Sequence, residues 1–279
     1  PKERLPWGIP LPFDQDYVTY VWFDALINYI SAYGSLDEVK KRGFWPADHH
    51  LLGKDILTTH AVYWSTMLQA IGLNPANNLF AHGWWTVNGQ KMSKSIGNVV
   101  EPNQLLDQFG VDAIRYFLLR EVPFGMDGDF SHKALIGRIN SDLANNLGNL
   151  LNRTINMMKR YHNNVVPKPT SPDEDADLKN EFRKGIDNVH KFYDNLAYNK
   201  ILESIWLLVD ITNKYIDKNG PWSLVKSEEG KQRLATVMYN LTECLRTISL
   251  LIYPFMPKSA ETMMKQLGIK TSIEEQGLD

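Results

Sequence analysis

The sequence has almost no cysteine. Cys244 is the one cysteine among 279 residues, so the chain cannot hold an internal disulfide framework. A structural zinc site built from several thiolates is excluded for the same reason, and we expect no zinc site within this chain. A lone thiol fits a reducing compartment, and we therefore expect a cytoplasmic protein.

Long apolar runs and a charge excess are also missing. No run approaches the length of a membrane-spanning helix, so we expect no membrane partner. The start, Pro1-Lys2-Glu3-Arg4, has neither the apolar segment of a signal peptide nor an initiator methionine, so we expect it to lie inside a longer protein. With 30 basic and 32 acidic side chains, the composition argues against a general polyanion binder. Any contact with nucleic acid must come from a local patch.

The first 130 residues alternate short apolar runs with helical patterns. Runs rich in β-branched, aromatic or other apolar residues predict strands over 17–23, 50–53 and 79–87. Helical patterns between them predict helices over 24–33 and 56–70, the second closed by Gly72. Strands that alternate with helices are typical of a parallel sheet. We predict an α/β domain over residues 1–130 that is the second half of a doubly wound, Rossmann-like sheet.

From residue 131 onward the apolar period is helical. Long patterns cover 143–158, 201–216 and 234–252, and the last is stopped by Pro254 and Pro257. The proline-containing stretch 166–173 predicts a loop. We predict an all-α domain over residues 131–279, built as an antiparallel helix bundle.

The strongest chemical signal is the sequence Lys91-Met92-Ser93-Lys94-Ser95, which lies between glycines. Such a loop can bend over a polyphosphate, where ammonium groups meet the charge that grows on leaving pyrophosphate. Most clusters of lysine and serine are only solvated basic turns. Here the complete order matches the signature loop of class I aminoacyl-tRNA synthetases. This match favours ATP binding by the five residues and catalytic roles for Lys91 and Lys94.

Two weaker motifs lie at predicted strand ends. Gly83 would let the backbone approach an adenine or ribose, and His82 could donate a hydrogen bond there, although a simple strand-end turn explains both residues equally well. Asp55 opens the second helix, in Gly53-Lys54-Asp55-Ile56. It could bind a ribose or an amino group at the carboxyl end of a strand, or could only cap the helix.

Aromatic residues could line a slot for an unbranched apolar side chain. Trp22 and Tyr29 bracket a predicted strand-to-helix turn, with the small Ala25 between them. His60 and Trp64 follow Ile56 on neighbouring parts of one helix face. Ordinary core packing is the commoner reason for both patterns.

These motifs occur in the same order in one family, and the chain resembles the methionyl-tRNA synthetases over nearly its whole length. The resemblance rests on Trp7-Gly8-Ile9-Pro10, 21–25, 53–56, 82–84, the lysine loop, 112–118, 145–153 and Pro221-Trp222. It implies that methionine and ATP, bound with Mg²⁺, give methionyl-adenylate and pyrophosphate. Methionine then passes to the 3′ end of tRNA(Met).

The resemblance also implies residue roles. Lys94 would have the dominant effect on the phosphates, and Asp55 would lie beside the methionine pocket. The pocket itself would be lined by Trp22, Ala25, Tyr29, Ile56, His60 and Trp64. The family's His-Ile-Gly-His motif and its zinc-bearing insert are absent from the sequence. We therefore expect the missing N-terminal part of the same enzyme to complete the site, and the chain alone to be inactive.

A polar stripe in the helical half is predicted to bind the tRNA anticodon. Residues 133–160 carry five basic side chains against Asp142, which gives a local basic surface. Asn149 and Arg153 are four residues apart and project from one face, while Trp222 offers a stacking plane. Each residue alone is more commonly a solvated side chain or a turn anchor. Together, at the family's positions, they favour anticodon recognition.

Two alternatives stay open. A class I synthetase for leucine, isoleucine or valine would share the lysine loop, but we would not expect residues 22–29 or Pro221-Trp222 in this form. A non-catalytic tRNA-binding remnant would need no intact lysine loop.

Overall fold

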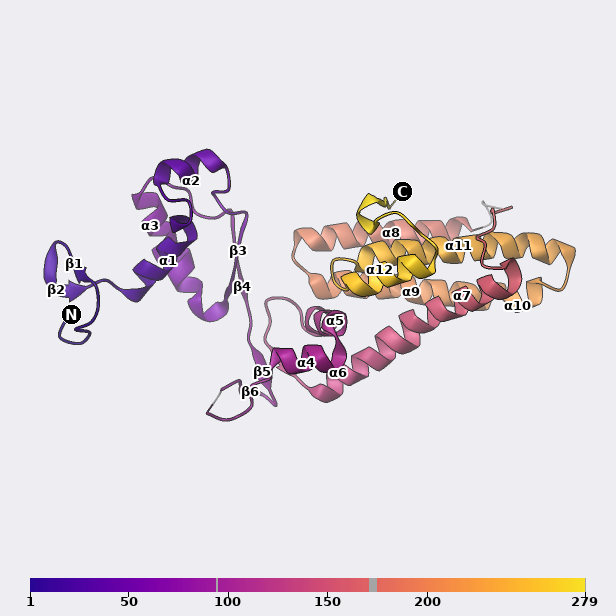
Figure 1. Cartoon of the computed structure of the whole chain (residues 1–279), viewed down its shortest axis with the longest axis horizontal. Helices are drawn as coiled ribbons and strands as arrows, with labels where there is room; N and C mark the ends of the chain where they lie inside the picture. Colours follow the sequence, from indigo (N-terminus) through magenta and orange to yellow (C-terminus); the bar gives the residue numbers. More distant parts are fainter. Residues whose placement is uncertain (94, 171–174, 279) are drawn as a thin grey trace. The chain divides into compact units, whose positions relative to one another are not determined.

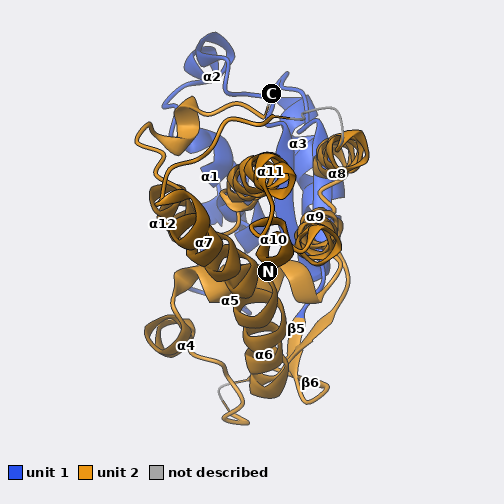
Figure 2. Cartoon of the chain, turned by 90° about the vertical axis from the view of Figure 1, so that its right-hand side faces the viewer, with its two compact units in different colours: residues 1–84 blue, residues 85–279 orange. Residues whose placement is uncertain are grey.

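The computed structural model describes residues 1–93, 95–170 and 175–278. They form two compact units, Pro1–Trp84 and Trp85–Asp279 (Figures 1 and 2). Within the described residues, no helix has both the length and the apolar character that crossing a membrane requires.

The first unit is organised around a parallel pair of strands, β3 (His49–Gly53) and β4 (Asn78–His82). The register sets His49 opposite Asn78 and Gly53 opposite His82, so both strands end at the same edge. The 3₁₀ turn η1 (Lys54–Ile56), the π-helix η2 (Thr59–Trp64) and α3 (Ser65–Ala70) connect them. The elements before β3 are β1 (Pro10–Leu11), β2 (Asp14–Val18), α1 (Val21–Ser31) and α2 (Leu36–Arg42).

Burial explains the position of α1. Leu26 and Ile30 are four residues apart and lie on one face of the helix, where both are buried. They pack against Trp64 and Leu68 from η2 and α3, and Val39 of α2 joins the same core. This core holds the connection between β3 and β4 against α1.

Some predicted boundaries in this unit were wrong. The strand predicted over 17–23 ends at Val18, and α1 begins at Val21, because a short apolar run does not by itself distinguish a strand from a helix. Trp22 and Tyr29 consequently lie within one helix instead of bracketing a strand-to-helix turn. The strand predicted over 79–87 is two strands, β4 and β5 (Trp85–Val87), which belong to different sheets. The helix predicted over 56–70 combines 3₁₀, π-helical and α-helical segments. Gly72, with φ +71°, follows it.

The second unit begins with a small sheet in the order β6-β5-β7, where β6 is Gln90–Lys91 and β7 is Gly128–Phe130. Strands β5 and β6 form a hairpin whose turn, Asn88-Gly89, has positive φ at both residues, as a tight hairpin requires. Helices α4 (Pro102–Phe109) and α5 (Val111–Glu121) separate β6 from β7. Phe117 of α5 packs against Phe130 in the core beneath the sheet.

Long helices make up the rest of this unit, as the sequence predicts (Figure 1). Their bounds are α6 (His132–Arg138), the π-helix η3 (Ile139–Gly148), α7 (Asn149–His162), α8 (Ala176–Asp194), α9 (Tyr198–Asn219), α10 (Pro221–Leu224), α11 (Glu228–Ile252), α12 (Pro257–Gln266) and the 3₁₀ turn η4 (Ile273–Glu275). Apart from α6, whose Leu135 belongs to the core beneath the small sheet, they share one large apolar core. The loop predicted over 166–173 has no regular structure in its described part, 166–170.

Hydrogen bonds fix the direction of neighbouring helices. Trp206 bonds to Asp142, Asp210 to Asn146, and Asp217 to Arg153, always 64 residues apart. A constant offset means that η3–α7 and α9 run in the same direction. Gly185 of α8 lies so close to α9 that a Cβ there would be 2.7 Å from Leu208 Cδ2.

A buried ion pair links three segments of the helical unit. Both Asp175 oxygens accept hydrogen bonds from Arg233 of α11, each at 2.7 Å. Asp175 also accepts from Tyr215 of α9 at 2.9 Å and from Asn240 at 2.8 Å. Burial alone would raise the pKa of this carboxyl, but the hydrogen bonds and the charge of Arg233 outweigh burial and lower it.

Candidate active site and anticodon face

The two weaker sequence motifs meet at the carboxyl ends of β3 and β4. Gly53 and His82 are opposite each other, and Asp55 follows Gly53 closely in η1. Asp55 Oδ1 accepts a long hydrogen bond, 3.4 Å, from Trp84 Nε1. A Cβ on Gly53 would lie 2.7 Å from Asp55 Oδ1, so a larger residue there would displace this carboxylate from its position. The edge thus gathers a carboxylate, an imidazole and an indole.

His82 and Lys54 are held at this same edge. His82 Nδ1 is 2.8 Å from Gly83 O, and the Lys54 Nζ lies 4.5 Å from the centre of the Trp84 ring. His82 is exposed and Gly83 is buried. An exposed imidazole and a carboxylate at one edge of a parallel strand pair can bind a hydroxylated ligand such as a ribose.

The residues predicted to line a pocket form an aromatic cluster. Trp22, Ala25 and Tyr29 lie on one face of α1, at helical spacing. Tyr29 OH is 3.0 Å from His60 Nε2, and the Trp22 and His60 rings are 6.2 Å apart. Ile56 O lies 3.0 Å from His60 Nδ1, so η1 joins the same group. Ala25 is exposed in this unit, and Ile56 is half-buried.

Trp64 is more deeply buried than a simple pocket wall. It is 1% exposed and belongs to the core of the unit, with its ring 5.8 Å from that of Tyr29. Its indole Nε1 is buried and has no hydrogen-bond partner among the described residues. A buried N–H without a partner needs an explanation, and a water or a bound ligand would supply one.

Two members of the cluster escaped sequence reasoning. The His50 ring is 4.6 Å from Tyr29 and 6.0 Å from His60, and the Trp45 ring is 5.9 Å from both His50 and Trp64. Burial, and then the charge of His60, lower the pKa of His50. The structure turns His50 and Leu52 of β3 inward, but the run His49-His50-Leu51-Leu52 does not alternate in polarity, so the sequence carries no signal for His50.

The lysine loop connects β6 to α4. Lys91 ends β6 and is exposed, Met92 packs on the core beneath the sheet, and the Ser93 and Ser95 hydroxyls are 2.7 Å apart. Lys94 lies outside the described residues. The hydroxyls and the exposed ammonium group suit an anionic ligand.

On the helical unit, the three predicted anticodon residues come from α7 and α10. Asn149 is exposed at the first turn of α7, and Trp222 is 49% exposed in α10. Arg153 Nη2 donates to Asp217 Oδ1 at 2.8 Å, near the end of α9 and five residues before Trp222. This contact brings Arg153 to the segment that leads into Trp222.

The predicted basic surface is weaker than its composition suggests. Arg138 Nε donates to Glu121 at 2.8 Å, and its Nη1 lies 3.3 Å from Asp142. Arg153 is paired with Asp217. Two of the five basic side chains counted over residues 133–160 are therefore neutralised within the molecule, because folding brings acidic partners to them.

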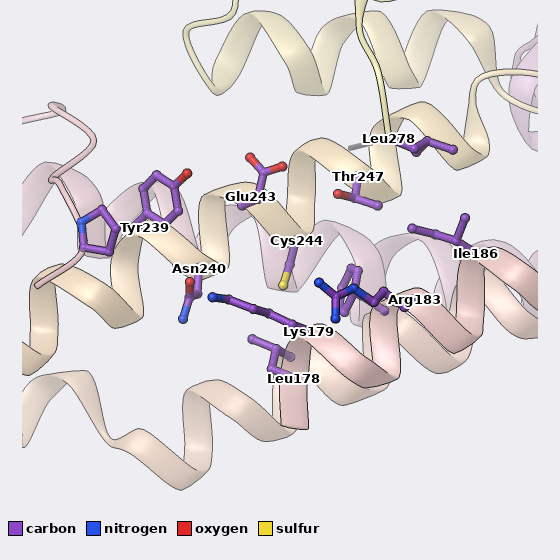
Figure 3. A pocket seen from close by; sticks show the side chains of 12 residues that line it. Leu178, Lys179, Arg183, Ile186, Tyr239, Asn240, Glu243, Cys244, Thr247 and Leu278 are labelled. Atoms are coloured by element: carbon purple, nitrogen blue, oxygen red, sulfur yellow. The ribbon is translucent and has the colours of Figure 1, made fainter. Parts of the chain in front are cut away.

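Neither a metal cluster nor the cavity between α8 and α11 adds to these residues. Within 1–93, 95–170 and 175–278, no three His, Cys, Asp or Glu side chains are grouped to hold a metal ion. A cavity of about 420 Å³ lies between α8 and α11 (Figure 3). Its lining, which includes Lys179, Arg183 and Glu243, contains none of the predicted site residues.

Comparison with known proteins decides the family. Residues 2–155 match the model "tRNA synthetases class I (M)". The chain belongs to the class I tRNA synthetases. Residues 175–278 match the anticodon-binding domain of tRNA ligases.

Relatives of this class I synthetase chain have one name in common. The "Methionine--tRNA ligase" of Caldanaerobacter subterraneus subsp. tengcongensis is 54% identical over 271 residues, which are 96% of this chain and 42% of the relative. The enzyme of the same name from Clostridium tetani is 49% identical over 271 residues, again 96% of this chain and 42% of the relative. The chain thus spans less than half the length of these relatives.

Solved structures agree. The structure of Mycobacterium tuberculosis methionyl-tRNA synthetase in complex with methionyl-adenylate matches with a TM-score of 0.85 and 44% identity. The match covers 92% of this chain and 52% of that one. The apo form of the same enzyme matches with a TM-score of 0.82 and 41% identity.

Proposed function

We propose that this chain is the loop-bearing part of the catalytic domain, together with the anticodon-binding domain, of a methionine–tRNA ligase. The enzyme joins methionine to ATP, forms methionyl-adenylate and releases pyrophosphate, and then transfers methionine to tRNA(Met). The observation that carries the proposal is the 54% identity to a methionine–tRNA ligase over 96% of the chain. The methionyl-adenylate bound by the Mycobacterium tuberculosis enzyme supports the same reaction.

The fold of the first part is proposed to be the second half of a doubly wound sheet. A parallel pair such as β3 and β4 normally lies inside a larger sheet with helices on its faces, because two strands alone are marginally stable. The remaining strands would come from residues of the same protein outside this sequence. The predicted domains, 1–130 and 131–279, remain a proposal. The antiparallel bundle predicted for the second domain does not describe every helix pair, because η3–α7 and α9 run in the same direction.

The methionine pocket is proposed to be lined by Trp22, Ala25, Tyr29, Ile56, His60 and Trp64, with Asp55 beside it. The contacts among Tyr29, His60 and Trp64 support this set. A thioether is apolar and polarizable, and it packs well against aromatic rings. Asp55, at the strand end, would accept from the methionine amino group or the ribose.

The adenylate would extend from this pocket toward His82 and Gly83. Residues Lys91, Met92, Ser93, Lys94 and Ser95 would bind the phosphates of ATP, which arrives as its Mg²⁺ complex. Lys91 and Lys94 would stabilise the charge that develops on pyrophosphate. Asn149, Arg153 and Trp222 would contact the anticodon, where amide and guanidinium groups suit base edges and the exposed indole suits stacking.

The test is methionine-dependent exchange of pyrophosphate into ATP, followed by charging of tRNA(Met), with the natural full-length protein. We expect exchange with methionine and none with leucine, isoleucine or valine. Exchange with one of those three amino acids would reassign the substrate. No exchange with any amino acid, together with retained tRNA binding, would identify a non-catalytic remnant.

A further inference from the structure

Asn98 lies just after the lysine loop, and its side chain bonds to the main chain of two loop residues. Its Oδ1 accepts a hydrogen bond from Ser93 N at 2.8 Å. Its Nδ2 donates to Lys91 O at 3.2 Å. One carboxamide thus uses its acceptor and its donor to tie residue 98 back to residues 91 and 93.

The main chain is shaped to bring Asn98 into this position. Ile96 N and Gly97 N both donate to Ser93 O, at 3.2 and 3.1 Å. Gly97 has φ +71°, a conformation that favours glycine and turns the chain back toward the sheet. A carboxamide is the side chain that fits here, because aspartate would lose the donor and alanine would lose both groups.

The opposite end of the loop is fixed by a different side chain. Asp129 Oδ1 of β7 accepts from Thr86 Oγ1 at 2.7 Å and from Gly89 N at 2.8 Å. These two bonds lower the pKa of Asp129, so the carboxylate stays charged. The hairpin turn before Lys91 is therefore held by the sheet. The loop between Lys91 and Asn98 is closed by Asn98.

We propose that Asn98 is a positioning residue for the lysine loop, a role that rests on the proposed function of the loop in adenylate formation. Cationic groups stabilise a transition state best when their geometry is set in advance. Asn98 sets it by fixing the carbonyl of Lys91 and the amide of Ser93. It makes no contact with the reacting atoms itself.

Limited proteolysis measures this closure without measuring activity. Trypsin must capture the carbonyl of Lys91 to cut the Lys91–Met92 bond, and Asn98 Nδ2 holds that carbonyl. In the natural full-length protein, Asn98→Ala should be cut at this bond about tenfold faster, the effect expected from losing one or two hydrogen bonds. The control Asn103→Ala, on exposed α4, should be cut at the wild-type rate. Equal rates for Asn98→Ala and wild type would overturn the proposal.

Exchange kinetics test the catalytic consequence. Asn98→Ala should lower kcat for pyrophosphate exchange by about tenfold and leave the KM for methionine within about twofold. Lys94→Ala, measured in the same assay, separates the function proposed for the loop from the positioning role proposed for Asn98. If Lys94→Ala has no effect, the function proposed for the loop is wrong. If Lys94→Ala lowers kcat for exchange and Asn98→Ala leaves kcat unchanged, the positioning role is wrong.

A second variant separates the positioning role from a general loss of fold. If Asn98→Ala raises cleavage at many sites, Asn98→Asp keeps the acceptor for Ser93 N and loses only the donor to Lys91 O. Its cleavage at Lys91–Met92 should lie between the wild-type and alanine rates, with other sites unchanged. Cleavage of Asn98→Asp at the wild-type rate would contradict the role of the donor.

Discussion

The Tyr29 hydroxyl lies 3.0 Å from His60 Nε2, although the two residues are 31 positions apart. His60 Nδ1 is 3.0 Å from Ile56 O, which can only accept, so Nδ1 carries the proton. In the neutral imidazole, Nε2 then accepts the hydrogen bond from Tyr29. The imidazole is therefore held from both sides, by α1 and by η1, in one tautomer.

This arrangement makes Trp64 a test of the methionine pocket. In the full-length protein, Trp64→Ala should raise the KM for methionine at least several-fold more than the KM for ATP, because its ring lies beside Tyr29. The substitution should also cost about 3–5 kcal/mol of stability, as for other buried tryptophans.

Leu68→Ala is the matched control. Leu68 is fully buried in the same core and belongs to α3. The substitution should lower stability by a similar amount and leave the KM values for methionine and ATP unchanged. Equal effects of Trp64→Ala on the two constants would point to a folding defect.

Asp175 should make the helical unit sensitive to acid. Its folded pKa is lowered, so its contribution to stability is complete well above the unfolded pKa of about 3.9 and is lost as pH falls through the lower folded value. Asp175→Asn should remove about 3 kcal/mol near pH 7, because it takes away the carboxylate charge that Arg233 faces in a mostly buried site.

Urea unfolding at several pH values, followed by circular dichroism, measures this contribution. The stability difference between wild type and Asp175→Asn should shrink as pH falls below about 4. Asp177→Asn, at an exposed carboxylate two residues away, should change little. If the stability difference between wild type and Asp175→Asn is independent of pH, the role given to the charged Asp175 carboxylate is refuted.

Trp222 tests the anticodon face. Trp222→Ala in the full-length protein should reduce kcat/KM for charging tRNA(Met) by about tenfold or more, in line with the cost of losing a base stack. It should leave methionine-dependent exchange unchanged, since exchange needs no tRNA. Tyr239→Ala, another exposed aromatic residue of the helical unit, serves as the control. Normal charging by Trp222→Ala would remove this residue from the recognition surface.

The sequence predicts the helical half well because its apolar residues repeat over long, uninterrupted segments. The patterns at 201–216 and 234–252 lie within α9 and α11. Helix α8 was not identified, because Gly185 interrupts its apolar pattern, and that glycine is there for the close contact with Leu208. The π-helical winding of η2 and η3 was also missed, since apolar spacing does not reveal which carbonyl an amide bonds to.

Local patterns could not give the partners of the site residues. The pairing of Arg153 with Asp217 joins residues 64 positions apart, and the edge-to-face contact of His50 with Tyr29 depends on how β3 packs against α1. The motifs did predict that Asp55 and His82 lie at strand ends, and these ends meet at one sheet edge because the two strands are parallel.

The central claim is that the lysine loop acts on the phosphates during methionine activation. Single-turnover formation of methionyl-adenylate by the full-length protein, wild type against Lys94→Ala, tests it most directly. We expect the variant to be slower by about 10²-fold or more, as for other groups that stabilise transition-state charge. An unchanged rate would contradict the account.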